Sequence, residues 1–318
     1  MNISDIKEAR ELIKPFIKET RLINSCIYDK CNLYLKPENL QYTGSFKVRG
    51  AFNKMLHLSD EEKANGVIAC SAGNHAQGVA LAAKHMNVKA VICMPKSAPK
   101  VKVDSTRAKG AEVVLVDGVY DDAYEKAVEL KEEKGYTFVH PFNDENVIAG
   151  QGTIALEILE ELPETDVIVC AVGGGGLISG IAYAAKSIKP DIKVYGVESS
   201  GAPSMYASMA NGYITKLNTA KTFADGIAVK EVGNLTFDYT NKYVDDVFAI
   251  KDEDILEAIK LMMRDEKIIA EGAGAAPVAA VLRNLIPDLK EDSNVVCVVS
   301  GGNIDIDMLS KIVIRGLD

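Results

Sequence analysis

The sequence predicts an α/β protein of two lobes, each with three α/β/α layers around a mostly parallel sheet. Short β-branched runs alternate with longer segments in which apolar residues recur at i, i+3 and i+4, which indicates strands alternating with helices. The strand candidates are continuously apolar, as burial on both faces of a parallel sheet requires. A length of 318 residues has room for about two domains of ~150 residues each, and no low-complexity linker separates them.

Nine short runs rich in Val and Ile are predicted as strands. In chain order they are Leu33–Lys36, Val67–Cys70, Ala90–Met94, Val113–Val116, Phe138–His140, Val167–Val172, Lys193–Val197, Val247–Ile250 and Val295–Val299. Helical spacing of apolar residues predicts helices at Asp121–Glu133, Ile148–Leu162 and Asp252–Arg264. A further helix is expected at Phe46–Leu56, with the Ser45 hydroxyl capping its first turn.

The composition is that of an ordinary globular protein with an acidic balance. Hydrophobic residues make up 47% and charged residues 25%, and 36 Lys+Arg against 45 Asp+Glu give a net charge of −9. A nucleic-acid or anionic-membrane partner is disfavoured, because binding phosphates over a surface needs a basic face. A small anionic ligand remains compatible, since backbone N–H groups can form a local site.

No signal peptide, membrane span or metal-binding cysteine pattern is predicted. Val167–Ala185 has nineteen residues without a charge, but five are Gly, so it is interpreted as a buried strand, a loop and a helix. Four of the six cysteines lie in or at the end of apolar runs, and none forms CxxC. Reduced core thiols in a cytoplasmic protein are expected.

Glycine-rich loops follow several predicted strands. They read SAGNHAQG, GGGGLISG, ESSGAP and SGGNID, and TGSFKVRGAF follows the first strand. In parallel α/β sheets, ligands bind at the carboxyl ends of the strands, on the loops that enter the next helix. The loops therefore predict one ligand site assembled from distant segments.

The loop Gly173–Leu177 is predicted to bind a phosphate. Its four glycines let consecutive backbone N–H groups converge at a helix N-terminus. No GK[ST] follows, which excludes a Walker nucleotide loop. Gly174, Gly176 and Gly180 approximate a dinucleotide fingerprint, and Glu198 lies where such a site keeps its ribose-binding acid. An NAD(P)-dependent dehydrogenase is therefore an alternative, as is a non-catalytic binding protein or a simple turn.

Lys47 is the candidate nucleophile. It follows Phe46 and stands between two glycines in GSFKVRG, in the expected first turn of a helix. The positive end of a helix disfavours an ammonium and so favours a neutral, reactive amine. Beside a phosphate loop, such an amine indicates a Schiff base with a phosphorylated aldehyde cofactor.

Two further loops supply polar groups. One loop leads into a helix whose N-terminus suits a substrate carboxylate, and it consists of Ser71, Ala72, Gly73, Asn74 and His75. In this loop, Asn74 could hold a cofactor hydroxyl. The Ser300 hydroxyl follows an apolar strand and could bond a heterocyclic nitrogen. Helix capping is the alternative role for Asn74 and for Ser300.

The chain contains four motifs in the order SFKVRGA, SAGNHAQG, GGGGL and SGGN. It also contains LKPENLQYTGSFK, IAGQGT and EGAGA. This combination resembles the fold type II pyridoxal-phosphate enzymes, specifically the threonine/serine dehydratases, over about residues 6–316. The resemblance implies a two-lobed, tryptophan-synthase-β-like fold. Residues 1–41 plus 145–318 would form the large cofactor-binding lobe and residues 42–144 a small mobile lobe.

The resemblance also implies a role for each motif residue, with pyridoxal 5'-phosphate as the cofactor. Lys47 would be the catalytic Schiff-base lysine, with Phe46 against the cofactor ring. The residues implied to bind the rest of the cofactor are Asn74 at its 3-oxygen, Gly173, Gly174, Gly175, Gly176 and Leu177 at its phosphate, and Ser300 at its pyridine nitrogen. Those implied to surround the substrate carboxylate are Ser71, Ala72, Gly73, Asn74 and His75.

The implied reaction is α,β-elimination that converts L-threonine to 2-oxobutanoate and ammonia, with side activity on L-serine to give pyruvate. A serine dehydratase is an alternative. A serine racemase is a weaker one, because racemases of this family place a Ser where this chain has Ala72. Those relatives also hold a divalent cation with an acidic loop. Glu198 matches, but Ser204 replaces the second acid, so no metal site is expected and a helix cap is favoured.

The chain ends soon after the SGGN motif, which is expected of the short family members that lack a C-terminal amino-acid-sensing domain, or of a chain cut at that boundary. The expected partners are a small amino-acid substrate and identical subunits, in a homodimer or homotetramer.

Overall fold

The computed structural model describes residues 1–314 and contains two sheets. The larger sheet has the strand order β1-β2-β10-β7-β8-β9, and the smaller has the order β5-β4-β3-β6. The strands are β1 Ile23–Ser25, β2 Asn32–Lys36, β3 Val67–Cys70, β4 Ala90–Pro95, β5 Glu112–Val116, β6 Thr137–Phe138, β7 Val167–Ala171, β8 Lys193–Ser199, β9 Asp246–Ile250 and β10 Asn294–Val298. Residues 315–318, at the end of the predicted large lobe, lie outside the described part of the chain.

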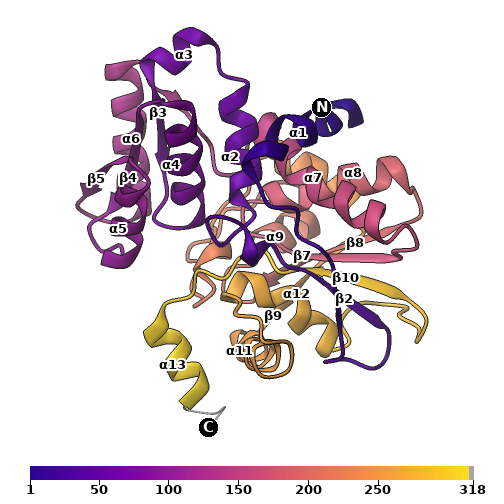
Figure 1. The fold of residues 1–318 in the computed structure, drawn as a ribbon. Helices are drawn as coiled ribbons and strands as arrows, with labels where there is room; N and C mark the ends of the chain where they lie inside the picture. The colour runs from indigo at the N-terminus through magenta and orange to yellow at the C-terminus, as the bar shows by residue number, and fades with distance from the viewer. Residues whose placement is uncertain (315–318) are drawn as a thin grey trace.

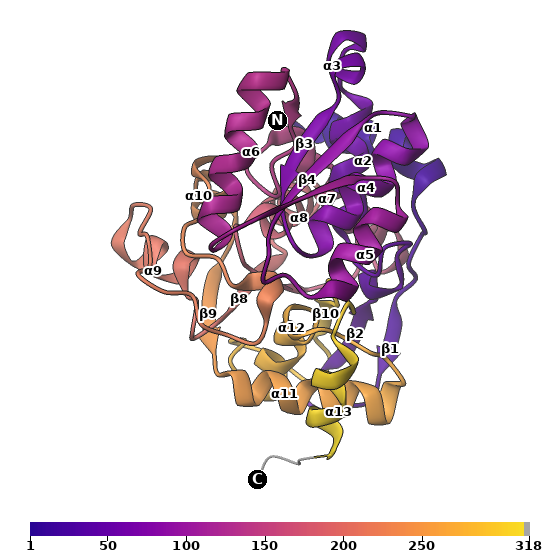
Figure 2. The same ribbon diagram turned by 90° about the vertical axis from the view of Figure 1, so that its left-hand side faces the viewer.

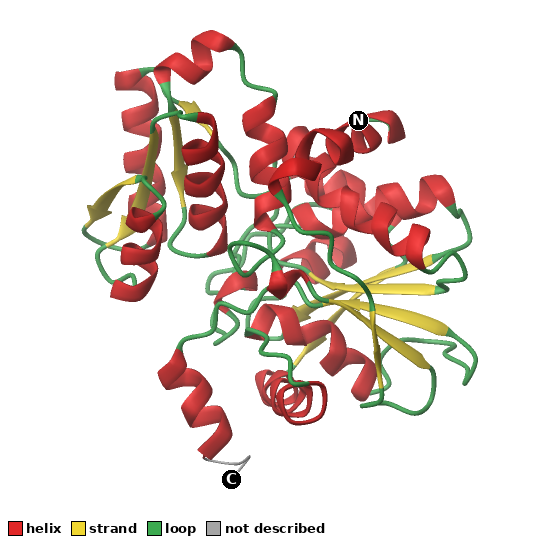
Figure 3. Ribbon diagram, in the orientation of Figure 1, coloured by secondary structure: helices red, strands yellow, loops and turns green. Residues whose placement is uncertain are grey.

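Helices cover both sheets (Figures 1 and 3). The α-helices are α1 Ile3–Ile13, α2 Lys47–Leu56, α3 Asp60–Asn65, α4 Asn74–Met86, α5 Lys100–Ala108, α6 Tyr120–Lys134, α7 Glu145–Glu161, α8 Gly176–Ile188, α9 Ser204–Asn211, α10 Asn234–Tyr243, α11 Asp252–Leu261, α12 Gly272–Leu282 and α13 Ile306–Ile314. Shorter helical segments are η1 Lys14–Phe16, η2 Glu38–Leu40, η3 Asp225–Ile227 and η4 Met262–Glu266, the last a π-helix.

Each sheet is the middle layer of three. In the larger sheet only the β1–β2 pair is antiparallel. One face packs on α11 and α12, and the other packs on α1, α7, α8 and α10. The smaller sheet is parallel throughout, with α2, α4 and α5 on one face and α6 on the other, as Figure 2 shows. The predicted α/β class with mostly parallel sheets is confirmed.

Some predicted elements differ in detail. The edge strand β1 was not expected, because it is three residues long and only Ser25 is buried. The helix predicted at 252–264 is α-helical only to Leu261 and then widens into the π-helical η4. Among the described residues, no helix is long and apolar enough to cross a membrane.

The prediction that Ser45 caps α2 was wrong. The helix begins at Lys47 with Phe46 as its N-cap residue, and no side chain caps it. Ser45 instead forms an isolated antiparallel bridge with Gly301, and the neighbouring Phe46 N–H donates to the Ser300 carbonyl at 3.0 Å. This pairing ties the start of α2 to the loop after β10, and the Ser45 hydroxyl has no hydrogen-bond partner in the described structure.

A buried ionic network fixes α2 against the larger sheet. The Arg49 guanidinium donates to both carboxylate oxygens of Glu38, at 2.8 Å each, and to both oxygens of Glu157 on α7, at 2.6 and 2.8 Å. The Lys36 ammonium donates to Glu157 at 2.6 Å. These four side chains are at most 6% exposed, so each charge depends on its partners for stabilisation.

Replacing Arg49 by Leu should reduce the free energy of unfolding by about 3–5 kcal/mol, because Glu38 and Glu157 would be left buried with unbalanced charge. Denaturant unfolding followed by circular dichroism measures this. Arg283→Leu is the matched control: this exposed arginine pairs with Asp254 and Glu257, and its loss should cost less than about 1 kcal/mol. Equal losses in the two variants would contradict the structural role of the network.

Candidate active site

A cavity of about 1210 Å³ is lined by the loops that follow β3, β7 and β10 and by the start of α2. The structure brings together in it every residue that the resemblance implied for cofactor or substrate binding. These are Phe46, Lys47, Ser71, Ala72, Gly73, Asn74, His75, Gly173, Gly174, Gly175, Gly176, Leu177 and Ser300. The cavity is therefore assembled from both sheets, as expected for ligand binding at the carboxyl ends of parallel strands.

The loop Gly173–Gly176 joins β7 to the N-terminus of α8. Gly175 has φ +91°, a conformation that favours glycine, and no side chain caps the helix. A Cβ on Gly174 would collide with the ring of Phe142. The Thr236 hydroxyl holds the loop by donating to the Gly174 carbonyl at 2.6 Å. Because the first N–H groups of a helix lack intrahelical acceptors, this end of α8 offers donors and a positive dipole to an anion.

The Lys47 side chain is half-buried, and its amine lies inside the cavity and faces a backbone carbonyl. Its Nζ donates to the Pro141 oxygen at 2.7 Å and lies 5.2 Å from the centre of the Phe46 ring. Burial lowers the pKa of Lys47 to about 8, and Glu271 opposes this shift. The direction is the one that the sequence predicted, but the cause is desolvation by burial and not the helix terminus.

Two histidines near Lys47 are held neutral. Burial, followed by the Lys47 charge, lowers the pKa of His75 to about 3 and that of His140 to about 4. His75 Nε2 lies 2.8 Å from the Val139 carbonyl. His140 Nδ1 accepts from the Phe142 and Asn143 N–H groups at 3.2 and 2.8 Å. Both imidazoles therefore serve as fixed dipoles in the wall around the amine.

Asn74 lines the cavity and is the middle member of a row of three hydrogen-bonded side chains. Its Nδ2 donates to Glu271 at 2.6 Å, and its Oδ1 accepts from Asn303 Nδ2 at 2.7 Å. The helix α4 begins at Asn74 with Gly73 as N-cap residue, so the capping alternative for Asn74 is excluded. Burial, and then Asp225, raises the pKa of Glu271 to about 7. Glu271 opens the EGAGA motif, but that motif alone predicted no role for it.

Ser300 is 3% exposed and lines the cavity directly after β10. The next described helix, α13, begins only at Ile306, so Ser300 does not cap it. The loop from His140 to Asn143 also lines the cavity and was not predicted from the sequence. It follows a two-residue strand, which gives little local signal.

The structure removes the main support for a dinucleotide site. The Glu198 carboxylate is buried and accepts from the Met205 and Tyr206 N–H groups at 2.9 and 2.8 Å, so it caps α9 and is not available to a ribose. Ser204 also donates to it, at 3.4 Å. In residues 1–314 no three His, Cys, Asp or Glu side chains are placed to share a metal ion.

Comparison with known proteins decides the family. A family described as "Pyridoxal-phosphate dependent enzyme" matches residues 13–301. The chain belongs to this family of pyridoxal-phosphate-dependent enzymes. It is 50% identical to an L-threonine ammonia-lyase of Thermotoga maritima, over all of this chain and 79% of that protein.

Solved structures of pyridoxal-phosphate-family relatives share the fold. The processed form of threonine deaminase isoform 2 from Solanum lycopersicum matches with a TM-score of 0.93 and 39% identity, over 98% of this chain and 86% of that one. Maize serine racemase matches with a TM-score of 0.93 and 36% identity, over 99% and 98%.

The residues around the cavity fit pyridoxal phosphate. A buried amine is available to an aldehyde, and the glycine loop offers backbone donors without side chains that would fill the space of a phosphate. Asn74 and Ser300 provide the polar groups that an aromatic heterocycle with ring oxygen and nitrogen needs. The donor set thus matches the family's cofactor at each of its polar ends.

The reactivity of Lys47 should rise with pH around pH 8. The neutral amine is the nucleophile, and its fraction grows as pH rises through a pKa of about 8, well below the 10.5 of an ordinary lysine. Acetylation of cofactor-free protein, quantified at Lys47 by mass spectrometry between pH 6 and pH 10, should level off near pH 9. A rate that keeps rising to pH 10 would contradict the shift.

Proposed function

We propose that the protein is an L-threonine ammonia-lyase that converts L-threonine to 2-oxobutanoate and ammonia, with side activity on L-serine to give pyruvate. The carrying observation is the buried Lys47 amine in the same cavity as the Gly173–Gly176 loop. The 50% identity to an L-threonine ammonia-lyase over the whole chain supports this choice of reaction.

The cofactor would be held by Lys47, Phe46, Asn74, Gly173 to Leu177 and Ser300. When bound, pyridoxal phosphate supplies an electron sink that stabilises negative charge at the substrate α-carbon. The positive end of α8 would attract the cofactor phosphate, and the Phe46 ring lies beside the Lys47 amine. The Ser300 hydroxyl, which lines the cavity, would be the partner of the ring nitrogen. A neutral hydroxyl there does not enforce ring protonation, which favours elimination over transamination.

Ser71 to His75 would bind the substrate carboxylate. The α4 helix begins at Asn74, and its first N–H groups point to the cavity end of the β3 loop. The Ser71 hydroxyl already accepts from the Gly73 N–H at 3.2 Å, which fixes the turn. Lys47 Nζ, freed from its carbonyl partner, takes the α-proton. Its lowered pKa suits a general base near neutral pH.

The segments 42–144 and 1–41 plus 145–318 are proposed as the two lobes, with the small one closing over the substrate. Two ion pairs support this, because they join α5 and α6 of the small lobe to the far side of the cavity. They are Lys102–Asp225, and Asp121–Lys230 at 3.3 Å. Closure would exclude water from the reacting carbon.

A serine racemase is the second candidate, favoured by the close structural match to the maize enzyme. Ala72 argues against it, because a methyl group cannot protonate the opposite face of the substrate. A serine dehydratase differs from our proposal only in the pocket for one methyl group, worth about 1–3 kcal/mol.

We further propose a cytoplasmic homodimer or homotetramer. The location is supported by the cysteines, since all six are free and five are buried.

Lys47→Ala should reduce 2-oxobutanoate formation from L-threonine by about a thousandfold or more, because it removes both the covalent anchor and the base. It should also abolish the visible absorption band of bound pyridoxal phosphate. Lys131→Ala, on the exposed side of α6, should change neither. If pyruvate forms from L-serine faster than 2-oxobutanoate forms from L-threonine, the serine dehydratase alternative is favoured. Conversion of L-serine to the racemate would favour the serine racemase.

Gly174→Ala should weaken cofactor binding by about tenfold or more, the equivalent of one hydrogen bond to a charged group. The new Cβ would collide with Phe142 and displace the loop. Fluorescence titration of cofactor-free protein with pyridoxal phosphate measures the change. Adding Phe142→Leu should recover part of the affinity; no recovery would show that the collision is not the cause.

A further inference from the structure

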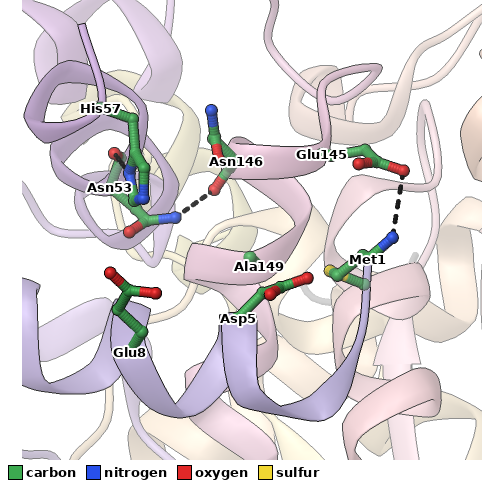
Figure 4. A pocket seen from close by; sticks show the side chains of 8 residues that line it. All are labelled: Met1, Asp5, Glu8, Asn53, His57, Glu145, Asn146 and Ala149. Carbon is green, nitrogen blue, oxygen red and sulfur yellow. Dashed lines mark hydrogen bonds and ion pairs between the residues drawn. The ribbon is translucent and has the colours of Figure 1, made fainter.

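A second pocket, of about 240 Å³, lies where α1, α2 and α7 meet (Figure 4). It shares no lining residue with the active-site cavity. Three carboxylates line it: Asp5 and Glu8 on α1 and Glu145 at the start of α7. Glu8 has no hydrogen bond or ion pair within residues 1–314, whereas Glu145 lies 3.3 Å from the Met1 nitrogen.

Asn53 gives independent support for a ligand here. Its side chain is 1% exposed, and its Nδ2 donates to the Asn146 carbonyl at 2.7 Å. Its Oδ1 is buried and has no hydrogen-bond partner among the described residues. Figure 4 shows this oxygen pointing across the pocket toward the Glu8 carboxylate. An unpaired buried acceptor is costly unless a donor reaches it.

His57 adds another acceptor. Its Nδ1 lies 2.7 Å from the Asn53 carbonyl oxygen, which can only accept, so Nδ1 carries the hydrogen. In the neutral imidazole, Nε2 is then an unprotonated acceptor. Figure 4 shows the His57 ring above the Asn53 amide, at the same end of the pocket as Glu8.

The nearby helix starts offer few free donors to an anion. At α1, the Asn2 Oδ1 accepts from the N–H groups of Ser4 and Asp5. At α7, the Asp144 Oδ1 accepts from those of Asn146 and Val147. Apart from the Met1 nitrogen, which pairs with Glu145, the polar atoms left facing the pocket are therefore mainly acceptors with negative charge, which suits a donor-rich cation.

We propose that this pocket binds a short aliphatic diamine. No three of its acidic and imidazole side chains are grouped as metal ligands within residues 1–314, which disfavours a bare metal ion. Figure 4 places Glu8 with Asn53 at one end and Asp5, which also accepts from the Asn2 N–H, at the other, with Ala149 between them; the Met1 nitrogen lies beyond Asp5, beside Glu145. An ammonium at each end joined by a few methylenes matches this arrangement. The ligand would contact α2, whose first residue is Lys47.

The test is isothermal titration calorimetry of 1,4-diaminobutane into the cofactor-loaded protein. Saturable binding is expected for the unchanged chain, with 1,4-butanediol, of equal length and no charge, showing none. Glu8→Gln should weaken the binding about fivefold, as expected for a partly exposed ion pair. Glu11→Gln, an exposed carboxylate on the same helix outside the pocket, should leave the affinity unchanged.

Three results would overturn the proposal. They are no saturable heat at millimolar diamine, the same affinity in all three proteins, and equal weakening in both variants. Binding of the amine at the active site alone would give the second result, because Glu8 does not line that cavity. Both substitutions lie on the exposed side of α1, so a thermal unfolding curve for each variant separates weakened binding from loss of fold.

Discussion

The rest of the site depends on one constraint: the Lys47 amine is buried without a carboxylate in direct contact with it. Lys47 Nζ faces the Pro141 carbonyl, and the imidazoles of His75 and His140 are kept neutral by the same burial. A carboxylate in direct contact would stabilise the ammonium and suppress its reactivity as a nucleophile. Glu271 lies close enough to raise the pKa of Lys47, but its Oε1 accepts a hydrogen bond from Asn74 Nδ2.

Such a buried amine needs a rigid helix to hold it. The α2 helix has no side-chain cap, so its start is held by backbone pairing with the loop after β10. Two residues further on, Arg49 is clamped between Glu38 and Glu157. The two contacts fix α2 to the larger sheet, while its apolar residues, such as Phe52 and Met55, pack with the smaller sheet's core. The helix therefore joins the two halves of the molecule.

The local pattern of the chain was sufficient to predict most strands, the glycine loops and the lysine. Buried parallel strands are continuous apolar runs, and Gly173–Gly176 and Lys47 stand in short motifs where each residue type has a specific physical use. Ser45 was misassigned because a hydroxyl before a helix is usually its cap. Here the bridge to Gly301, more than 250 residues away, determines the backbone of Ser45. No local pattern reports such a pairing.

The sequence by itself determined the alternation of strand and helix and the candidate residues for the site, because these depend on side-chain type and spacing of a few residues. Only the tertiary structure decided which groups face one another: that Asn74 bonds both Glu271 and Asn303, that Glu198 caps α9, and that burial depresses the pKa of Lys47. The physical reason is that desolvation and hydrogen bonding act through space over a few ångströms. Residues at that distance are often separated by hundreds of positions in the chain.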